Sequence, residues 1–247
     1  MIHQALHREP VALDREAHRA LKMRPGAPDW SAASKLNAYF VHAVEFADLG
    51  KEFPLVFMRA GQHAAGKPLV APMAIFGLAD GENLFVENGR WLADFMPSML
   101  RTYPFATARV DEQRYAVCID RSAPAWSETE GTPLFEADGQ PTQLLRDMQG
   151  VLDRLEGEMA RTRMACERLL AHDLLAEKRF DATLPDGQKL SVGGFLTVDE
   201  AKLTALGDAA VVELYRSGVL GLITLHQASL GNMARLVERR RRRAAAA

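Results

Sequence analysis

The feature that most constrains the fold of this chain is an apolar stripe whose members are alternately three and four residues apart. The stripe consists of Leu145, Met148, Leu152, Leu155, Met159, Thr162, Cys166 and Leu169. This spacing places its members on one face of an α-helix over about three heptads. Pro141 and Thr142 suit the first turn, whereas Gly150 and Gly157 each weaken a helix by about 1 kcal/mol relative to alanine. The stripe therefore predicts one long helix.

This apolar stripe has two candidate partners. It packs either on the C-terminal helices of the same chain or on a second copy of the chain, as a dimer seam. Three short heptads with interior glycines make a weak autonomous coiled coil. We therefore favour packing within the chain, and the oligomeric state stays open.

The region before the long helix carries the signals of β-strands and tight turns. Apolar runs rich in β-forming residues are expected as strands at 54–58, 72–78, 83–88, 106–110 and 115–120. Asp80-Gly81 predicts a hairpin between the second and third runs, because a type I′ turn needs positive φ. Residues 111–113 predict the turn of the last pair, and Pro97–Leu100 predict one helical turn.

After the long helix the sequence predicts a hairpin and further helices. Lys178–Thr183 and Lys189–Val192 flank the turn sequence Pro185-Asp186-Gly187, so we expect them to pair. Two short helices with aspartate caps follow. A last amphipathic helix runs from Leu222 into an arginine-rich tail.

Together these signals predict an α+β fold: an antiparallel, curled β-sheet region followed by a long helix, a small β-hairpin and a C-terminal helical cap. Residues 1–28 are expected to form an N-terminal arm and 29–123 the mainly antiparallel β region. Residues 124–247 would hold the long helix, the hairpin and the C-terminal helices, in one cooperative domain. Hydrophobic residues make up 48% of the chain and charged residues 25%, which excludes disordered and fibrous proteins.

The sequence predicts neither a membrane span nor an export signal. No window has 18 apolar residues without charge, and the first 28 residues lack an apolar leader core. The two cysteines, Cys118 and Cys166, give no disulfide framework. We therefore expect a soluble, cytoplasmic protein.

Gly61–Pro68 matches the first seven positions of a phosphate-binding P-loop. The eighth position of a P-loop needs a serine or threonine hydroxyl to ligate magnesium, and a backbone N–H to open a helix. Pro68 has neither, and it also keeps Lys67 out of helical geometry. We therefore predict a hairpin loop here and no nucleotide site.

The seven histidines form no metal-binding motif. His42 and Glu45 could share one face at i, i+3, but two ligands do not make a zinc site. His226 lies on an apolar helix face, where a hydrogen-bonded core histidine is expected. No nucleophile motif or dinucleotide fingerprint is present. The sequence therefore predicts no metal, no cofactor and no catalytic residue.

The densest group of polar and aromatic residues lies between Asp80 and Phe105. A ligand-binding surface in this segment would use Glu82, Asn83, Arg90, Trp91, Arg101 and Tyr103. Arginine and tryptophan stack and form hydrogen bonds at binding surfaces. The alternative is that turn and core roles explain most of these residues. We expect Trp91 and Tyr103 to be structural, with Arg90 and Arg101 partly exposed at the edge of a shallow pocket.

The run Arg239–Arg243 is strongly basic and suggests two interpretations. A basic run attracts nucleic acid or anionic lipid. However, no aromatic residue interrupts it, and the rest of the chain is mildly acidic. We therefore expect a solvated tail at a helix C-terminus, where cations suit the helix dipole, and no nucleic acid partner.

A further set of short motifs extends over nearly the whole chain. These motifs are Val11–Arg19, Glu45-Phe46, Phe53–Phe57, Glu82–Val86, Gly89-Arg90-Trp91, Arg101–Phe105, Gly194-Phe195 and Val198-Asp199. Together they resemble the SapC family of bacterial proteins, which is named for a gene in a surface-layer locus.

The resemblance implies an accessory role near surface-layer or secretion functions, with an unidentified protein partner and a possible place at the cell surface. It brings no established active site. We therefore expect a SapC-like, non-enzymatic interaction protein. The alternative is a small-molecule-binding protein, or an enzyme of unrecognised class, with its site around Glu82–Tyr103.

Overall fold

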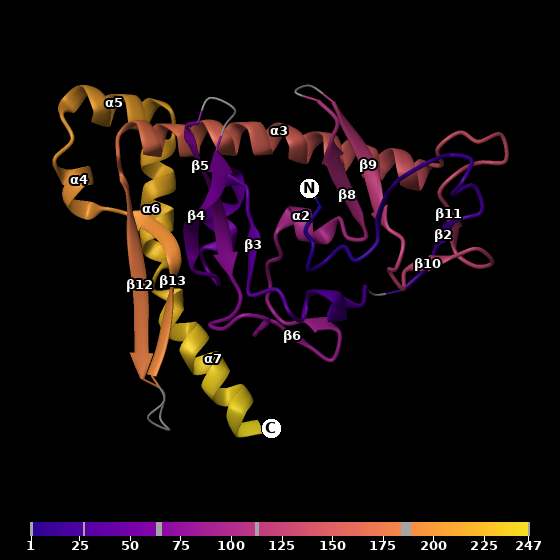
Figure 1. Ribbon diagram of the computed structural model, residues 1–247, viewed down its shortest axis with the longest axis horizontal. Helices are drawn as coiled ribbons and strands as arrows, with labels where there is room; N and C mark the ends of the chain where they lie inside the picture. Colours follow the sequence, from indigo (N-terminus) through magenta and orange to yellow (C-terminus); the bar gives the residue numbers. More distant parts are fainter. Residues whose placement is uncertain (1, 27, 63–65, 112–113, 184–188, 247) are drawn as a thin grey trace. The chain divides into compact units, whose positions relative to one another are not determined.

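A computed structural model describes residues 2–26, 28–62, 66–111, 114–183 and 189–246 (Figure 1). The chain forms two compact units that each combine distant segments of the sequence. Unit 1 comprises Met1–Ser34, Val86–Leu92 and Ser98–Gly157, and unit 2 comprises Lys35–Phe85, Ala93–Pro97 and Glu158–Ala247. Helix α3 (Gln143–Ala171) gives its first half to unit 1 and its second half to unit 2. Unfolding in a single cooperative step stays a prediction.

Unit 1 contains small antiparallel sheets and the first half of α3. Its strands are β1 (Pro10–Ala12), β2 (Lys22–Met23), β6 (Val86–Glu87), β7 (Arg90–Trp91), β8 (Phe105–Arg109), β9 (Tyr115–Asp120), β10 (Trp126–Ser127) and β11 (Thr132–Pro133). They pair in the orders β1-β9-β8, β10-β2-β11 and β6-β7. The short helices are η1 (Trp30–Ala33) and α2 (Ser98–Arg101).

The hydrophobic core of unit 1 joins α3 to the β8–β9 hairpin. Leu145 and Leu152 are fully buried, in one cluster with Phe105, Ile119 and Trp126. The rings of Phe105 and Trp126 pack edge to face, with their centroids 5.4 Å apart. The apolar stripe therefore packs within the chain as predicted. Its first half packs on strands rather than on the C-terminal helices.

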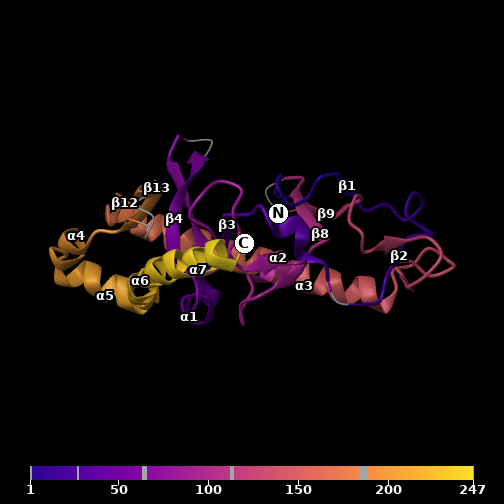
Figure 2. The same ribbon diagram turned by 90° about the horizontal axis from the view of Figure 1, so that it is seen from below.

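Unit 2 is built on a five-stranded antiparallel sheet with the order β12-β13-β4-β5-β3. Its strands are β3 (Ala38–Phe40), β4 (Leu55–Gln62), β5 (Pro68–Ile75), β12 (Leu175–Thr183) and β13 (Lys189–Val198). Its helices, besides the second half of α3, are η2 (Ala43–Glu45), α1 (Phe46–Leu49), α4 (Glu200–Thr204), α5 (Asp208–Arg216), α6 (Val219–Ser229) and α7 (Asn232–Ala246). Helix α6 lies beside β4, and α7 follows it at an angle (Figures 1 and 2).

A polar stripe along α6 and α7 ties these helices to the start of β4. His226, Ser229 and Asn232 follow one another at intervals of three residues. The Ser229 hydroxyl accepts a hydrogen bond from the Leu55 backbone N–H at 3.0 Å. The Asn232 amide donates to the Gly50 carbonyl at 2.8 Å. These side chains satisfy backbone groups that would otherwise be buried without partners.

His226 completes this link between the helices and the sheet. Its Nε2 accepts from the Val198 N–H at 3.1 Å, and its Nδ1 donates to the Leu55 carbonyl at 2.7 Å. In the described part of the chain, β13 and β4 share one register pair, Leu196 with Phe57. The imidazole therefore bridges the two strands beside that pair. His226 is fully buried and hydrogen-bonded, which confirms the prediction of a core histidine.

The α+β class is confirmed, together with the long helix and the C-terminal helices, and the predicted strands are found in both compact units. The predicted strands at 54–58 and 72–78 belong to the sheet of unit 2. The predicted hairpin at 106–120 belongs to unit 1. The hairpin after α3 is longer than expected, and it extends the unit 2 sheet because β13 pairs with β4.

The turn at Asp80-Gly81 does not join two paired strands as predicted, although the Leu84 N–H donates to the Phe76 carbonyl across it at 2.9 Å. The chain does turn there, with Gly81 at φ +71°. The following strand instead pairs forward, Val86 with Trp91, across a turn at Asn88 and Gly89. These two residues have φ +49° and +73°, as a type I′ turn requires. The sequence thus has two neighbouring turn signals, Asp80-Gly81 and Asn88-Gly89, and the second of them connects paired strands.

The last predicted helix is interrupted. Helix α6 ends at Ser229 and α7 starts at Asn232, so the chain bends next to Gly231. The bend brings the Asn232 amide to the carbonyls of Gly50 and Phe53. The expected turns at 112–113 and 185–187 lie outside the described residues.

We predict that His226 makes unit 2 sensitive to acid. Burial lowers the pKa of His226 to about 4, although its bond to the Leu55 carbonyl opposes the shift. The folded pKa lies below the unfolded value near 6.5, so this contribution is complete above pH 6.5 and is lost as the pH falls towards 4. The neutral His226 side chain thus contributes about 3 kcal/mol to the free energy of unfolding at neutral pH.

Urea unfolding of the wild type and His226→Gln at pH 7 and pH 4.5 measures this contribution. The free-energy gap between the two proteins should be clearly larger at pH 7, because only the wild type loses the histidine contribution in acid. An equal gap at both pH values would contradict the neutral, buried imidazole.

Candidate functional site

The six residues expected to bind a ligand are divided between the two units. Glu82 and Asn83 belong to unit 2. Arg90, Trp91, Arg101 and Tyr103 belong to unit 1.

In unit 2, Glu82 and Asn83 bind arginines of helix α7. The Glu82 carboxylate forms an ion pair with Arg240 at 3.2 Å, and the Asn83 carbonyl accepts from Arg243 at 2.7 Å. Arg239 lies over the Phe85 ring, 4.3 Å from its centroid. The expectation of a solvated tail was therefore wrong in part, because three of the five arginines bind the Glu82–Phe85 segment.

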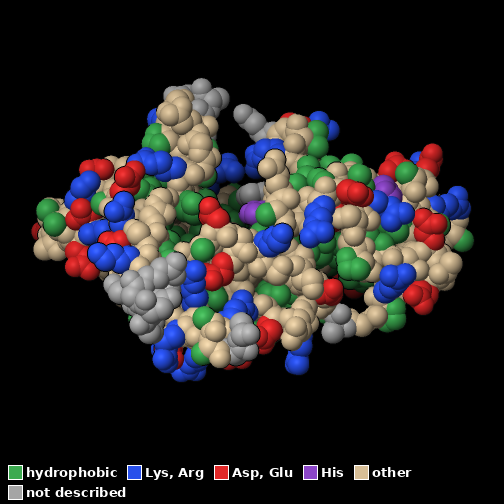
Figure 3. Space-filling model, turned by 60° about the horizontal axis from the view of Figure 1, so that its bottom comes forward, with side chains coloured by type: hydrophobic (Ala, Val, Ile, Leu, Met, Phe, Trp, Pro, Cys, Tyr) green, Lys and Arg blue, Asp and Glu red, His purple; other side chains and the backbone are tan. Residues whose placement is uncertain are grey.

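The other two arginines of the run, Arg241 and Arg242, both pair with Glu238 on the exposed side of α7. On the face drawn in Figure 3, Lys and Arg side chains are interspersed with Asp and Glu. Glu82 and Asn83 thus have structural partners in α7, and the run is neutralised in part by neighbouring carboxylates.

In unit 1, the β6–β7 hairpin presents Arg90 as an exposed side chain and Trp91 as a half-buried one. The hairpin also positions η1. The Gly89 carbonyl accepts from the Trp30 N–H at 2.9 Å. A Cβ at Gly89 would lie 2.5 Å from the Asp29 carboxylate oxygen. Glycine is therefore needed here for space as well as for its positive φ.

Arg101 is the last residue of α2, and Tyr103 follows two residues later. Arg101 is exposed, and its guanidinium lies 3.4 Å from the Ser98 hydroxyl. Tyr103 is half-buried, and its hydroxyl donates to the Asp120 carboxylate at 2.9 Å. The ring of His7 lies against the Tyr103 ring, with centroids 5.6 Å apart. Of the six predicted residues, Tyr103 is the one that lines a described cavity.

Asp120, at the end of β9, is fully buried and is the centre of a hydrogen-bond network. Besides Tyr103, it accepts from the Glu9 backbone N–H at 2.9 Å and from the Ser122 hydroxyl at 2.8 Å. Burial by itself would raise the pKa of Asp120, but the hydrogen bonds from Glu9, Ser122 and Tyr103 outweigh it and lower the pKa. Burial, and then the bond to Asp120, raise the pKa of Tyr103.

A small pocket of about 180 Å³ opens beside this network. It is lined by Arg8, Asp29, Ser31, Ala32, Tyr103, Ser122 and Pro124. Asp29 caps η1 through the N–H of Ser31, and the hydroxyl and N–H of Ser31 lower the pKa of Asp29. The pocket therefore has one carboxylate and one guanidinium on its wall.

The hydroxyl groups of this pocket all face carboxylates. Tyr103 and Ser122 donate to Asp120, and Ser31 donates to Asp29. Each hydroxyl has a single proton, so once that proton is donated to a carboxylate the oxygen can act toward a further group only as an acceptor. Among the residues that the structure describes, none forms an ion pair with the Arg8 guanidinium. Arg8 is thus the pocket's available donor.

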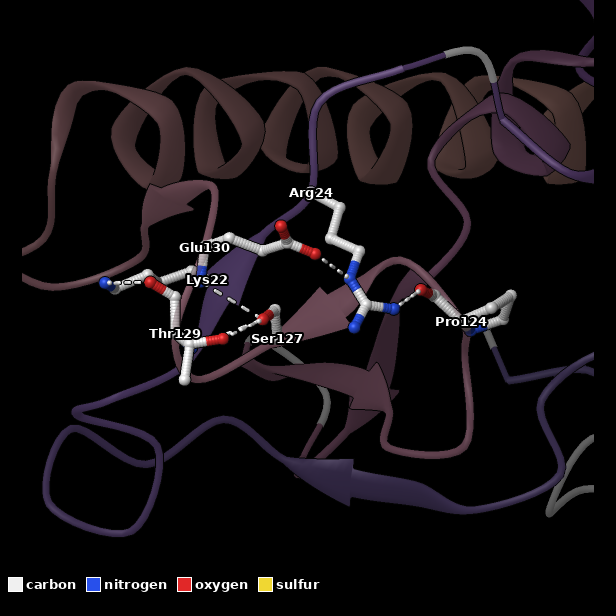
Figure 4. A network of polar contacts seen from close by, with 6 residues as sticks. All are labelled: Lys22, Arg24, Pro124, Ser127, Thr129 and Glu130. Carbon is white, nitrogen blue, oxygen red and sulfur yellow. Dashed lines mark hydrogen bonds and ion pairs between the residues drawn. The ribbon is translucent and has the colours of Figure 1, made fainter.

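A second pocket, of about 240 Å³, shares Asp29, Tyr103 and Pro124 with the first. Its remaining lining is mostly apolar: Met23, Pro25, Gly26, Pro28, Pro104 and Ala125, with Arg24. The Arg24 guanidinium binds Glu130 and the Pro124 carbonyl, both at 3.1 Å (Figure 4). Arg24 is therefore held in the wall by these two partners, whereas Arg8 has no ion-pair partner among the described residues.

The sequence pointed to one member of this pocket and missed the others. Arg8, Asp29, Asp120 and Ser122 belong to no motif. The pairing of β1 with β9 brings Arg8 to Asp120 and Ser122, whereas Asp29 is placed by its role as the cap of η1. A signal was available for Asp29 alone, since an aspartate after Pro28 often caps a helix.

The sequence contains a His–Glu pair at i, i+3, His42 and Glu45, and a P-loop-like segment, Gly61–Pro68. In the described ranges, no group of three or more His, Cys, Asp or Glu side chains could hold a metal ion. His42 and Glu45 do meet, at 2.9 Å. Residues 63–65 of the P-loop-like segment lie outside the described residues, and Pro68 starts β5 rather than a helix.

Comparison with known proteins gives one match. The SapC family model matches residues 13–236. The chain belongs to the SapC family. The match includes most of both units of this SapC protein and all the pocket residues except Arg8. Searches of curated proteins and of solved structures gave no match. No described helix is long and apolar enough to cross a bilayer.

We predict that Tyr103→Phe destabilises this SapC protein by about 1–2 kcal/mol at pH 7, because the Asp120 carboxylate loses a hydrogen bond in a half-buried place. The folded pKa of Asp120 is depressed, so its contribution is present at neutral pH and lost as the pH falls through that value. The loss should therefore shrink in acid.

Chemical denaturation at pH 7 and pH 3 checks this, with Tyr215→Phe as the matched control. Tyr215 is 73% exposed, so its hydroxyl should contribute nothing measurable. A Tyr103→Phe variant as stable as that control at pH 7 would show that the network does not hold unit 1.

Proposed function

We propose that this SapC protein is a non-enzymatic accessory protein that acts by binding, and that the pocket at Tyr103 is its ligand site. The observation that carries the proposal is the state of the pocket's polar groups. Its hydroxyls are fixed as acceptors, and one cation, Arg8, lacks an ion-pair partner in the described residues. Together with the neighbouring cavity, the pocket approaches the size of about 300–1,000 Å³ typical of small-molecule sites.

The same chemistry favours binding over catalysis. A serine nucleophile needs a base that accepts its proton at neutral pH. Ser122 donates instead to Asp120, whose pKa is lowered, so that carboxylate is a weak base. Tyr103 has a raised pKa and stays protonated. These groups orient a ligand without exchanging protons with it.

We also propose that the protein is associated with surface-layer or secretion functions, and the family resemblance supports this association. A protein partner would need a surface of its own. Unit 2 offers an apolar groove of about 670 Å³ beside α6, with Val44 67% and Leu225 37% exposed. Exposed apolar grooves of this kind bind the apolar face of a partner helix. We propose this groove as the second candidate site.

A thermal-shift screen tests the proposed ligand site. Panels of primary amines, organic acids, sugars and amino acids are added to the wild type, Arg8→Gln and Arg15→Gln. At least one class should raise the melting temperature of the wild type and of Arg15→Gln, but not of Arg8→Gln, because a ligand stabilises the state that binds it. If no class does so, or if Arg8→Gln keeps the shift, the site is not a binding site.

A further inference from the structure

The pocket at Tyr103 has a charge pattern that specifies a class of ligand. Its acceptors are the Asp29 carboxylate and the hydroxyl oxygens of Ser31, Tyr103 and Ser122. Its one charged donor is the guanidinium of Arg8. A ligand that satisfies this wall needs several donors on a cationic group and, separately, an anionic group.

An α-ammonium group has the first of these properties. It carries three N–H donors and one positive charge, and it is small enough to meet Asp29 and two hydroxyl oxygens together. A neutral sugar hydroxyl would bring one donor, and it would meet hydroxyls whose own protons are already engaged by Asp120. Asp29 is ionised at neutral pH, as an aspartate with its ordinary pKa would be, so it presents a negative charge to an ammonium group.

A carboxylate has the second property. A guanidinium binds a carboxylate through two parallel hydrogen bonds, which gives both strength and orientation. Arg24, the other guanidinium near this wall, is engaged by Glu130 and by the Pro124 carbonyl. Arg8 is therefore the group that selects the anion.

The neighbouring cavity provides for the rest of the ligand. It shares Asp29, Tyr103 and Pro124 with the polar pocket, so a group attached to the ammonium-bearing carbon can enter it. Met23, Pro28 and Pro104 make its surface largely apolar. This favours an aliphatic or aromatic side chain over a charged one.

We propose that unit 1 binds a free α-amino acid with an apolar side chain. The ammonium group lies at Asp29 and the hydroxyls of Tyr103 and Ser122. The carboxylate lies at Arg8, and the side chain lies in the Met23–Pro104 cavity. This inference rests on the proposed ligand site and names its ligand class.

Isothermal titration calorimetry of the full chain tests the proposal with four probes: L-leucine, L-leucinamide, N-acetyl-L-leucine and glycine. Leucine should bind, and each of the other probes should bind about tenfold or more weakly, because each lacks one recognised group. Arg8→Gln should reduce the preference for leucine over leucinamide to about onefold. Asp29→Asn should do the same for leucine over N-acetyl-leucine.

Arg15→Gln and Asp138→Asn, both exposed outside the pocket, are the matched controls and should leave all four affinities unchanged. Circular dichroism checks that each variant is folded. If leucine does not bind while another class in the thermal-shift screen does, the amino-acid proposal is wrong and the ligand site stands. If nothing binds at the pocket, both are wrong. Equal binding of leucine and leucinamide to the wild type would also overturn the proposal.

Discussion

A buried carboxylate holds unit 1 together. Asp120 lies at the end of β9 and accepts hydrogen bonds from the Glu9 backbone, the Tyr103 hydroxyl and Ser122. An ionised carboxylate out of water is costly unless such donors surround it. The N-terminal segment, the loop after α2 and the loop after β9 must therefore meet at one point. That convergence builds the pocket wall, fixes the hydroxyls as acceptors and leaves Arg8 as the available donor.

Unit 2 also depends on buried hydrogen bonds, but here polar side chains of two helices bind the backbone. Side chains of α6 and α7 form hydrogen bonds with backbone groups of Gly50 and Leu55. The arginines of α7 then dock on the Glu82–Phe85 segment. A tail that looks like a solvated charge run is thus partly a structural element. Its docking explains why Glu82 and Asn83, expected at a ligand site, serve the fold.

The sequence predicted the features that depend on local pattern. The stripe from Leu145 to Leu169 gave the long helix, and alternation with a short turn gave the β8–β9 hairpin. The role of His226 followed from its apolar surroundings. Strand partners across long separations were not predictable, because hydrophobic alternation says which face is buried but not against which strand. The pocket was missed for the same reason: Arg8 and Ser122 meet through the pairing of β1 with β9.

Tyr103 and Ser122 can present acceptors to the pocket because Asp120 is ionised and accepts their hydrogen bonds. A pH titration of the Asp120 carboxyl carbon by NMR tests it directly, with the assignment made from Asp120→Asn. We expect the pKa of Asp120 to lie below the ordinary aspartate value of about 3.9. A pKa above that value would mean that Asp120 is protonated more easily than a solvated aspartate. The hydroxyls would then be free to donate, and the account of the pocket would be contradicted.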